Sequence, residues 1–257
     1  MSCSSNRKKI LISNDDGINS EGIKVLSEKL SAVCDVYIMA PASNQSAVSS
    51  RISLYKDLEF VRYDEKTYSC SGTPADCVIS AFCSDFFGGA KFDAVFSGIN
   101  AGPNMGTDTV YSGTIAAARQ GVLYGVPAVA VSLESPHFDY DNKDFNFVPL
   151  AEFCAKNLDQ LISLCRDDLF VSINATSADE YNDVVFASMC KRQYHDRVEA
   201  VETGEGRYTG KCIGGKITVE GAENCDYNVA RSGKISISLL HANPSYEVYD
   251  GDIKFNF

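Results

Sequence analysis

The sequence predicts an α/β protein with a doubly wound, mostly parallel sheet and a β-rich extension at its C-terminal end. Three observations support this class. Short apolar segments alternate with segments of helical periodicity as far as residue 175. Polar or glycine-rich turns follow the apolar segments, as expected where parallel strands end. Beyond residue 175 the helical signals fade, and short β-like segments alternate with glycine-rich turns.

Residues 9–40 predict a strand, a helix and a second strand. The apolar run at 9–13 (KILIS) stops at Asn-Asp-Asp-Gly, which is typical of a buried strand that ends in a turn. Ser20 can cap the following helix. The apolar residues of that helix recur at helical spacing and are Ile23, Leu26, Leu30 and Val33. Residues 36–40 (VYIMA) form the second predicted strand, which Pro41 closes.

A polar loop and a helix follow the second strand. The loop spans residues 42–50, and residues 52–70 are expected to be irregular or β structure. Thr-Pro-Ala-Asp at 73–76 predicts the start of a helix that runs to about residue 87. In this motif Thr caps the helix, Pro fits the first helical position, and Asp reaches back to the cap.

The alternation continues to the end of the predicted core. Residues 94–97 form a third strand, and Ser-Gly-Thr at 112–114 begins a helix that ends near residue 124. Residues 127–133 (PAVAVSL) show no polar alternation, which predicts a fourth strand covered on both faces. A helix at about 147–165 and a strand at 169–174 complete the pattern. It is the pattern of a Rossmann-like sheet with helices on both faces.

The domain organisation follows from the change of pattern. We expect residues 1–175 to form the α/β core. Residues 176–257 are expected to form a β-hairpin extension of the same domain, packed on the core or on another subunit. Its β-like segments are 184–189, 216–219 and 234–240.

Charge and composition exclude several classes of protein. Lys and Arg number 23 against 34 Asp and Glu, a net charge of −11, so a protein that coats nucleic acid duplexes is not expected. The apolar stretches are far shorter than the ~20 residues of a membrane span. No two of the ten cysteines are separated by only two residues, which argues against a zinc ribbon or a disulfide framework. We therefore expect a cytoplasmic protein with no membrane partner.

Polar residues follow three strands that should end at one edge of the sheet. Asp15 and Asp16 follow the first strand, Ser46 lies in the loop after the second, and Asn100 follows the third. Adjacent carboxylates repel each other, and a divalent cation removes that repulsion. Carboxylate, amide and hydroxyl oxygens suit Mg²⁺ or Mn²⁺. Asp-Asp-Gly is also a common turn sequence, so both interpretations stay open at this point.

Ser112, Gly113 and Thr114 at a predicted helix start provide a candidate anion site. The free N–H groups and the helix dipole favour an anion there, and Gly113 allows close approach. An ordinary N-cap explains the same residues, and taken alone it is the preferred interpretation. Neither a Walker A motif nor a G-x-G-x-x-G fingerprint follows the first strand. The three histidines have no metal-ligand spacing.

Three motifs together resemble those of the SurE family, the survival-protein-E nucleotidases. They are ILISNDDGINSEGI at 10–23, SGTPADCV at 71–78 and SGINAGPNMGTDTVYSGTIAAA at 97–118. A weaker similarity lies at 226–240, DYNVARSGKISISLL, where such proteins have a strand after a polar turn. One departure is Ala47, where the family commonly has a glycine. A position that needs a left-handed backbone tolerates alanine poorly.

The resemblance implies a metal-dependent phosphoric monoester hydrolase, similar to acid phosphatases, that acts on nucleoside 5′- and 3′-monophosphates. Some members also act on short polyphosphate. It implies one Mg²⁺ or Mn²⁺ per subunit, with Asp15 and Asp16 as catalytic residues. The implied metal ligands are Asp15, Asp16, Ser46 and Asn100. The implied phosphate-binding residues are Asn104, Ser112, Gly113 and Thr114. A homodimer or homotetramer is implied as well, with the C-terminal β segment exchanged or packed between subunits.

Two other functions remain possible from the sequence. An aspartyl-phosphate phosphatase also needs a strand-end Asp and Mg²⁺, but its two Asp residues are usually spaced by one, whereas Asp15 and Asp16 are contiguous. A nucleotide sensor that binds without turnover could use the same edge of the sheet. Trapping a phospho-aspartate would favour the first alternative. Binding of a nucleotide without hydrolysis would favour the second.

Overall fold

The computed structural model describes residues 7–137 and 144–245. Its centre is a nine-stranded sheet with the order β3-β4-β2-β1-β5-β6-β7-β13-β8. The strands of this sheet are β1 (Lys9–Ser13), β2 (Asp35–Pro41), β3 (Phe60–Arg62), β4 (Thr67–Cys70), β5 (Ala94–Ala101), β6 (Ala128–Glu134), β7 (Leu169–Thr176), β8 (Val184–Phe186) and β13 (Ile235–His241). From β4 to β7 all neighbours are parallel, and β3 and β13 pair antiparallel with β4 and β7. The predicted α/β class with a mostly parallel sheet is confirmed.

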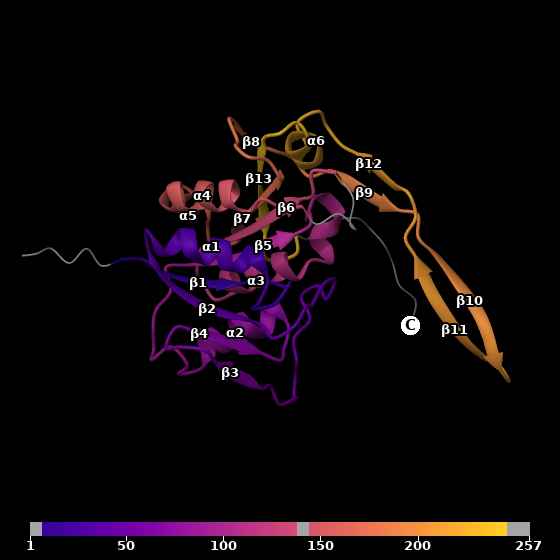
Figure 1. Cartoon of the computed structure of the whole chain (residues 1–257), viewed down its shortest axis with the longest axis horizontal. Coiled ribbons are helices and arrows are strands. Elements are labelled where there is room, and N and C mark those ends of the chain that lie inside the picture. The colour runs from indigo at the N-terminus through magenta and orange to yellow at the C-terminus, as the bar shows by residue number, and fades with distance from the viewer. Residues whose placement is uncertain (1–6, 138–143, 246–257) are drawn as a thin grey trace, which may run out of the picture.

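Helices cover both faces of the sheet, as Figure 1 shows. The helices are α1 (Glu21–Ser31), α2 (Pro74–Cys83), α3 (Gly113–Leu123), α4 (Val148–Lys156), α5 (Leu158–Leu164) and α6 (Asp226–Arg231). Buried side chains of α1, α4 and α5 form one core with the sheet, and those of α2 and α3 form a second core on the opposite face. The first strand contributes to both cores, because Ile10 and Ile12 pack in one and Leu11 in the other. This explains why its sequence is apolar without alternation.

The helix boundaries differ from the predicted ones in two places. The helix expected over 147–165 is divided into α4 and α5 at Asn157, whose side-chain amide donates to the Phe153 carbonyl at 2.8 Å. The helix that begins at Thr-Pro-Ala-Asp ends at Cys83 rather than near residue 87. Its predicted start is confirmed: the Thr73 hydroxyl accepts from the Asp76 amide, and the Asp76 carboxylate accepts from the Thr73 amide.

The start of α1 also differs in detail. The Ser20 side chain makes no capping hydrogen bond; instead its oxygen accepts from the Asn14 amide at 2.8 Å. Val33 lies beyond the last residue of α1 and is 49% exposed, so it does not belong to the apolar face of the helix. The other three predicted apolar positions, Ile23, Leu26 and Leu30, are buried.

The C-terminal part contributes both to the main sheet and to a projecting hairpin. The expected segments 184–189, 216–219 and 234–240 overlap β8, β12 (Ile217–Glu220) and β13, and the last two strands each end one residue later than expected. Strand β12 pairs with β9 (Lys191–Tyr194). Beyond them β10 (Arg197–Gly204) and β11 (Arg207–Ile213) form a hairpin that extends away from the body of the protein (Figure 1).

The weaker similarity at 226–240 predicts a strand after a polar turn, and β13 follows the turn at 232–234. The residues before that turn, 226–231, form helix α6, which was not predicted. The helix has only six residues, too few for a periodic apolar pattern to show in the sequence.

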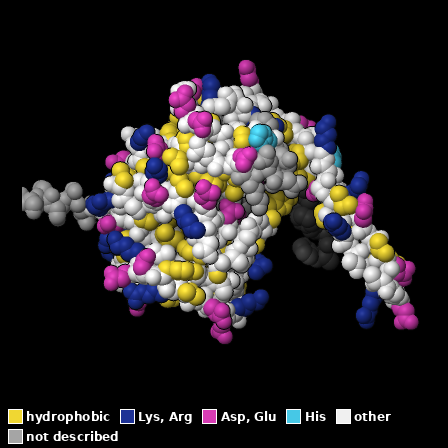
Figure 2. Space-filling view, in the orientation of Figure 1, with side chains coloured by type: hydrophobic (Ala, Val, Ile, Leu, Met, Phe, Trp, Pro, Cys, Tyr) yellow, Lys and Arg dark blue, Asp and Glu magenta, His cyan; other side chains and the backbone are white. Residues whose placement is uncertain are grey.

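Acidic and basic side chains are interspersed over the face shown in Figure 2, which therefore carries no extended cationic field. The nine cysteines that the structure describes are all free thiols, and Cys3 lies outside the described residues. Within residues 7–137 and 144–245, no helix has the length and apolar character needed to cross a membrane. The last twelve residues of the expected extension, 246–257, also lie outside the described residues.

Candidate active site

The turn after β1 holds Asp15 and Asp16 in a fixed conformation. The Asn14 side chain closes the turn, donating to the Gly17 carbonyl at 3.0 Å and accepting from the Gly17 amide at 3.2 Å. Gly17 has a φ of +100°, and a Cβ there would lie 3.2 Å from the Ser43 carbonyl carbon. Glycine is therefore required both by the backbone and by the close approach of the next loop.

Asp15 is buried against the start of α3. Only 4% of the residue is exposed, and its Oδ1 accepts a 2.5 Å hydrogen bond from the Thr114 hydroxyl. A Cβ on Gly113 would lie 2.8 Å from the Cβ of Asp15, so no larger residue fits there without movement. Burial raises the pKa of Asp15 to about 6, and the negative charge of Asp16 adds to this, while hydrogen bonds from Thr114 oppose it.

Asp16 joins the turn to the end of β5. One of its carboxylate oxygens accepts from the Ala101 amide at 3.0 Å. Asn100, the residue before Ala101, donates from its side chain to the Gly102 carbonyl at 2.8 Å. Strands β1 and β5 are parallel neighbours with Ser13 opposite Ser97, which brings their carboxyl ends together. The turn after β1 and the last residues of β5 thus carry Asp16 and Asn100 at one edge of the sheet.

The loop after β2 reaches the same edge. The Gln45 amide donates to the backbone carbonyl of Asp15 at 2.7 Å, and the Ser46 amide donates to the Asn44 side chain at 2.9 Å. Ser46 and Asp16 line one cavity of about 650 Å³. Ala47 has a φ of +57°, in the left-handed region where the sequence suggested that glycine would be preferred.

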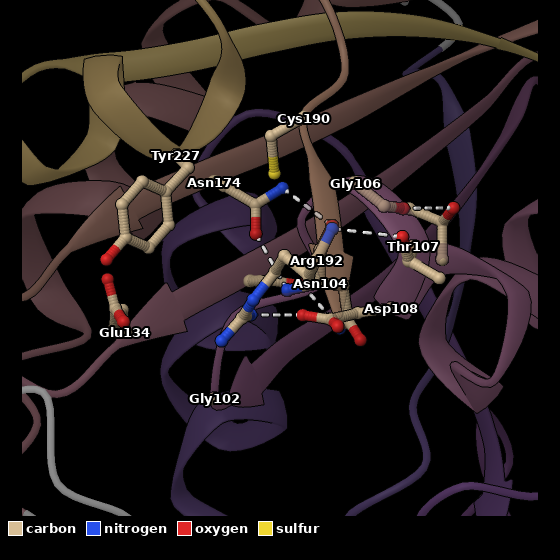
Figure 3. Close-up of polar contacts among 12 residues, drawn as sticks. Gly102, Asn104, Gly106, Thr107, Asp108, Glu134, Asn174, Cys190, Arg192 and Tyr227 are labelled. Carbon is tan, nitrogen blue, oxygen red and sulfur yellow. Dashed lines mark hydrogen bonds and ion pairs between the residues drawn. The ribbon is translucent and has the colours of Figure 1, made fainter. Parts of the chain in front are cut away.

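The four residues predicted to bind phosphate lie close to this edge, but they already make internal contacts. The Ser112 hydroxyl accepts from the Ile115 amide at 3.1 Å, as an N-cap does. Asn104 is 7% exposed, and its side chain donates to the Ser132 hydroxyl at 2.8 Å. Its backbone amide donates to the side-chain oxygen of Asn174 at 2.8 Å (Figure 3). Gly113 and Thr114 contact Asp15. The residues that line the 650 Å³ cavity, as far as the structure describes them, include none of these four.

One part of the cavity lining, here called the far wall, comes from elements that were not predicted to lie at the site. Glu134 ends β6, Arg192 lies in β9, and Tyr227 and Arg231 lie in α6. Arg231 forms a two-point ion pair with Glu134, with N···O distances of 2.7 and 3.2 Å. No local sequence pattern indicates this wall, because it depends on the short helix α6 and on a strand that was not predicted.

Arg192 and Asp226 dock the C-terminal segments onto the rest of the site. Arg192 is 4% exposed and forms an ion pair with Asp108, which also accepts from the Tyr194 hydroxyl. Asp226 is 1% exposed and accepts from the amides of Gly106 and Cys190 at 2.7 and 2.9 Å. Residues 106–110 form the short 3₁₀ helix η1, so both carboxylates join η1 to the C-terminal part (Figure 3).

The side chains at this site offer two carboxylates and two neutral oxygen donors, and this chemistry suits a hard cation. Within residues 7–137 and 144–245, no group of three or more His, Cys, Asp or Glu side chains is placed to hold a metal. Burial raises the pKa of Asp15, and repulsion from the adjacent Asp16 adds to the rise. The other two predicted ligands, the hydroxyl of Ser46 and the amide of Asn100, also offer oxygen atoms, and oxygen donors fit Mg²⁺ or Mn²⁺ better than zinc.

These features define a class of protein: a doubly wound α/β protein with a carboxylate-centred ligand site at the carboxyl ends of its parallel strands. Within this class, the family description "Survival protein SurE" matches residues 10–196. The chain belongs to the SurE family.

Individual relatives match nearly the whole chain. It is 34% identical to "5'-nucleotidase SurE" of Gemmatimonas aurantiaca, covering 91% of this chain and 92% of the relative. It is 35% identical to "5'-nucleotidase SurE" of Haemophilus influenzae, strain KW20, over the same shares. The crystal structure of the SurE protein from Aquifex aeolicus superimposes with a TM-score of 0.77 at 28% identity, covering 92% of this chain and 94% of that one.

Proposed function

We propose that this protein is a nucleotidase that hydrolyses nucleoside 5′- and 3′-monophosphates to nucleoside and phosphate with the help of one divalent cation per subunit. The observation that carries the proposal is the meeting of three strand-end segments around Asp15 and Asp16, beside a 650 Å³ cavity that Asp16 and Ser46 line. Relatives that cover nine-tenths of the chain carry the name 5′-nucleotidase. The cavity has the size of a small-molecule site, about 300–1,000 Å³.

The proposed ligands of the cation are Asp15, Asp16, Ser46 and Asn100. When bound, a Mg²⁺ or Mn²⁺ ion supplies charge neutralisation at the phosphate and lowers the pKa of a coordinated water. The chain itself prepares these ligands. The Ala101 amide fixes one oxygen of Asp16, and the Thr114 hydroxyl fixes one oxygen of Asp15. Phosphoryl transfer depends chiefly on positioning and charge stabilisation, so no histidine base is required.

Asn104, Ser112, Gly113 and Thr114 are proposed to form the phosphate side of the site. The dipole at the start of α3 favours negative charge in its neighbourhood. Thr114 already uses its hydroxyl on Asp15, so its contribution includes the orientation of that carboxylate. One carboxylate of the pair accepts the proton of the attacking water.

A panel of phosphate-release assays tests the proposal. Adenosine and guanosine 5′- and 3′-monophosphates and short polyphosphate are each offered with Mn²⁺, with Mg²⁺ and with EDTA. We expect metal-dependent release from the monophosphates, and Asp16→Asn is expected to abolish it while leaving the circular dichroism spectrum unchanged. Asp159→Asn is the matched control, since Asp159 is exposed and forms an ion pair with Lys8 at 2.7 Å.

Four results would contradict the proposal. Activity that EDTA leaves unchanged would show that hydrolysis does not depend on a divalent cation. Near-native turnover by Asp16→Asn would remove Asp16 from the site. Binding of a nucleotide without any turnover in Mn²⁺ would favour the sensor, and a trapped phospho-aspartate would favour covalent catalysis.

We also propose that residues 1–175 form the core and that 176–257 extend the same domain and take part in a homodimer or homotetramer. The β10–β11 hairpin supports this, because it exposes Val198, Val201 and Tyr208, each at least 65% accessible in the single chain. Light scattering of the full chain and of a form lacking 197–213 provides the test. A monomeric full chain would contradict the proposal.

A further inference from the structure

The cavity beside Asp16 has a lining of mixed chemistry. Its polar side chains include Asp16, Asn44 and Ser46. The lining also includes four aromatic and apolar side chains, namely Phe145, Phe147, Ile217 and Tyr227. A cavity that held phosphate alone would need only the polar side chains.

The charged groups of the far wall are neutralised in pairs. Arg231 lies against Glu134 with an N···O distance of 2.7 Å, and the Glu134 side chain is only 6% exposed. Arg192 is likewise paired with Asp108. Each arginine of the wall therefore faces a carboxylate, so the wall carries little net charge. A second phosphate group would gain little attraction there, whereas an uncharged ring would not be repelled.

Tyr227 is the aromatic side chain of this wall, and Arg231 packs against it. The guanidinium of Arg231 lies over its ring, 4.3 Å from the centroid, and Arg231 is itself fixed by the two-point pair with Glu134. In Figure 3 the Tyr227 hydroxyl points toward the Glu134 carboxylate. A rigid aromatic side chain loses little conformational freedom when a planar ligand packs against it.

We propose that Tyr227, supported by Arg231 and Glu134, is the residue that binds the base of the nucleotide by contact with its ring. The inference rests on the proposed nucleotidase function and deepens it. In this arrangement the phosphate lies at Asp16, the sugar spans the cavity, and the base packs on Tyr227. This arrangement makes the protein selective for phosphate esters that carry an aromatic base.

Two substrates separate base binding from phosphate chemistry. Adenosine 5′-monophosphate carries a base, and ribose 5-phosphate presents the same ester without one. Tyr227→Ala is expected to lower kcat/KM for adenosine 5′-monophosphate roughly tenfold, through KM, as for the loss of one base–aromatic stack. The value for ribose 5-phosphate is expected to stay within about twofold. Tyr227→Phe keeps the ring and should behave as the unaltered protein.

Two further variants guard the result against structural effects. Tyr227→Leu keeps apolar volume without an aromatic face and is expected to resemble Tyr227→Ala. Tyr63→Ala removes a tyrosine that is 54% exposed and is not among the cavity-lining residues, and it should change neither substrate. Equal loss for both substrates in Tyr227→Leu and Tyr227→Ala, or no loss for either, would overturn the inference.

A binding measurement keeps the inference separate from the proposed activity. Adenosine has no phosphate, so its binding, measured by calorimetry on the full chain, needs no hydrolysis. We expect adenosine to bind the unaltered protein and to bind Tyr227→Leu roughly tenfold more weakly. If the protein hydrolyses nothing yet shows this difference, the proposed activity fails and the base site stands. If adenosine binds both proteins equally or neither, the base site fails whatever the activity.

Discussion

The hydroxyl of Thr114 donates a 2.5 Å hydrogen bond to Oδ1 of Asp15, although the two residues are 99 positions apart in the chain. The start of a helix commonly attracts an anion from solution because its N–H groups are unsatisfied. Here the first turn of α3 is directed at a carboxylate of the protein itself. The relationship links the third motif of the sequence to the first, and it opposes the rise in the pKa of Asp15 that burial causes.

Thr114→Val tests this link, because valine keeps the shape of threonine and lacks the hydroxyl. Without its donor, the carboxylate form of Asp15 is less favoured, so we expect the affinity for Mn²⁺ to fall roughly tenfold or more, as when the hydrogen-bond partner of a metal ligand is lost. Titration of activity with Mn²⁺ measures this. Thr114→Ser keeps the donor and serves as the matched control. Equal affinities for all three proteins would contradict the expected role.

The metal-free protein should lose stability as pH rises through the range in which Asp15 ionises. Burial raises the pKa of Asp15 from 3.8 to about 6, so the folded state binds the proton more tightly than the unfolded state. The free energy of unfolding in EDTA is therefore expected to receive a contribution from Asp15 that is complete below pH ~4 and is lost by pH ~6. The contribution is about 3 kcal/mol, from two pKa units.

Asp15→Asn should remove the part of the pH dependence of the free energy of unfolding that comes from Asp15. Urea denaturation at several pH values in EDTA compares the variant with the unaltered protein, and we expect the variant to be relatively more stable above pH ~6. Asp57→Asn, at an exposed position, is the control. A constant difference between Asp15→Asn and the unaltered protein from pH 4 to pH 7 would show that Asp15 does not ionise in this range.

Asp226 should be a main anchor of the C-terminal part. Its buried carboxylate accepts hydrogen bonds from the amides of Gly106, Cys190 and Tyr227, at 2.7 to 2.9 Å. Asp226→Ala leaves these N–H groups without that acceptor and is expected to lower the free energy of unfolding by about 2–4 kcal/mol. Chemical denaturation measures the loss, and Asp183→Ala, at an exposed carboxylate, is the control.

Hydrogen exchange localises the same effect. In Asp226→Ala the amides of Gly106 and Cys190 are expected to exchange faster than in the unaltered protein, while amides of β1 keep their protection. Unchanged protection of Gly106 and Cys190 would show that other contacts hold the two segments together.

Ala47→Gly should stabilise the loop after β2. Ala47 has a φ of +57°, a conformation that costs a residue with a Cβ about 1–2 kcal/mol. Part of this gain is offset by the greater freedom of glycine in the unfolded chain, so a net increase of about 0.5–1 kcal/mol in the free energy of unfolding is expected. Thermal denaturation provides the measurement. Ala42→Gly, at a position without a positive φ, should instead be neutral or destabilising.

The sequence predicts the elements that position the carboxylate pair, because each has a local signal. The apolar run before Asp15 marks a buried strand, and the Thr73 capping box marks the start of α2. Parallel strands end at one edge, so the positions of Asp16 and Asn100 at neighbouring strand ends follow from the order of the strands. The roles of these residues as ligands stay a prediction.

The far wall of the cavity could not be predicted in the same way. Arg192 is buried because it meets Asp108, 84 positions away, and no local pattern marks such a pair. Helix α6 is held by the tertiary contacts of Asp226 rather than by its own periodicity. Asn157 divides one predicted helix into two, because its side chain donates a hydrogen bond to the backbone carbonyl of Phe153. The spacing of the apolar residues does not reveal this break.

The β10–β11 hairpin has a consequence for the order in which the parts of the protein unfold. Every residue of β10 is exposed in the single chain, and the ladder of the hairpin pairs these two strands only with each other. A two-stranded ribbon in water is marginally stable at best. In a single subunit this hairpin should therefore unfold at a lower temperature than the main sheet. Only a second subunit packed along it would make it as stable as the rest of the molecule.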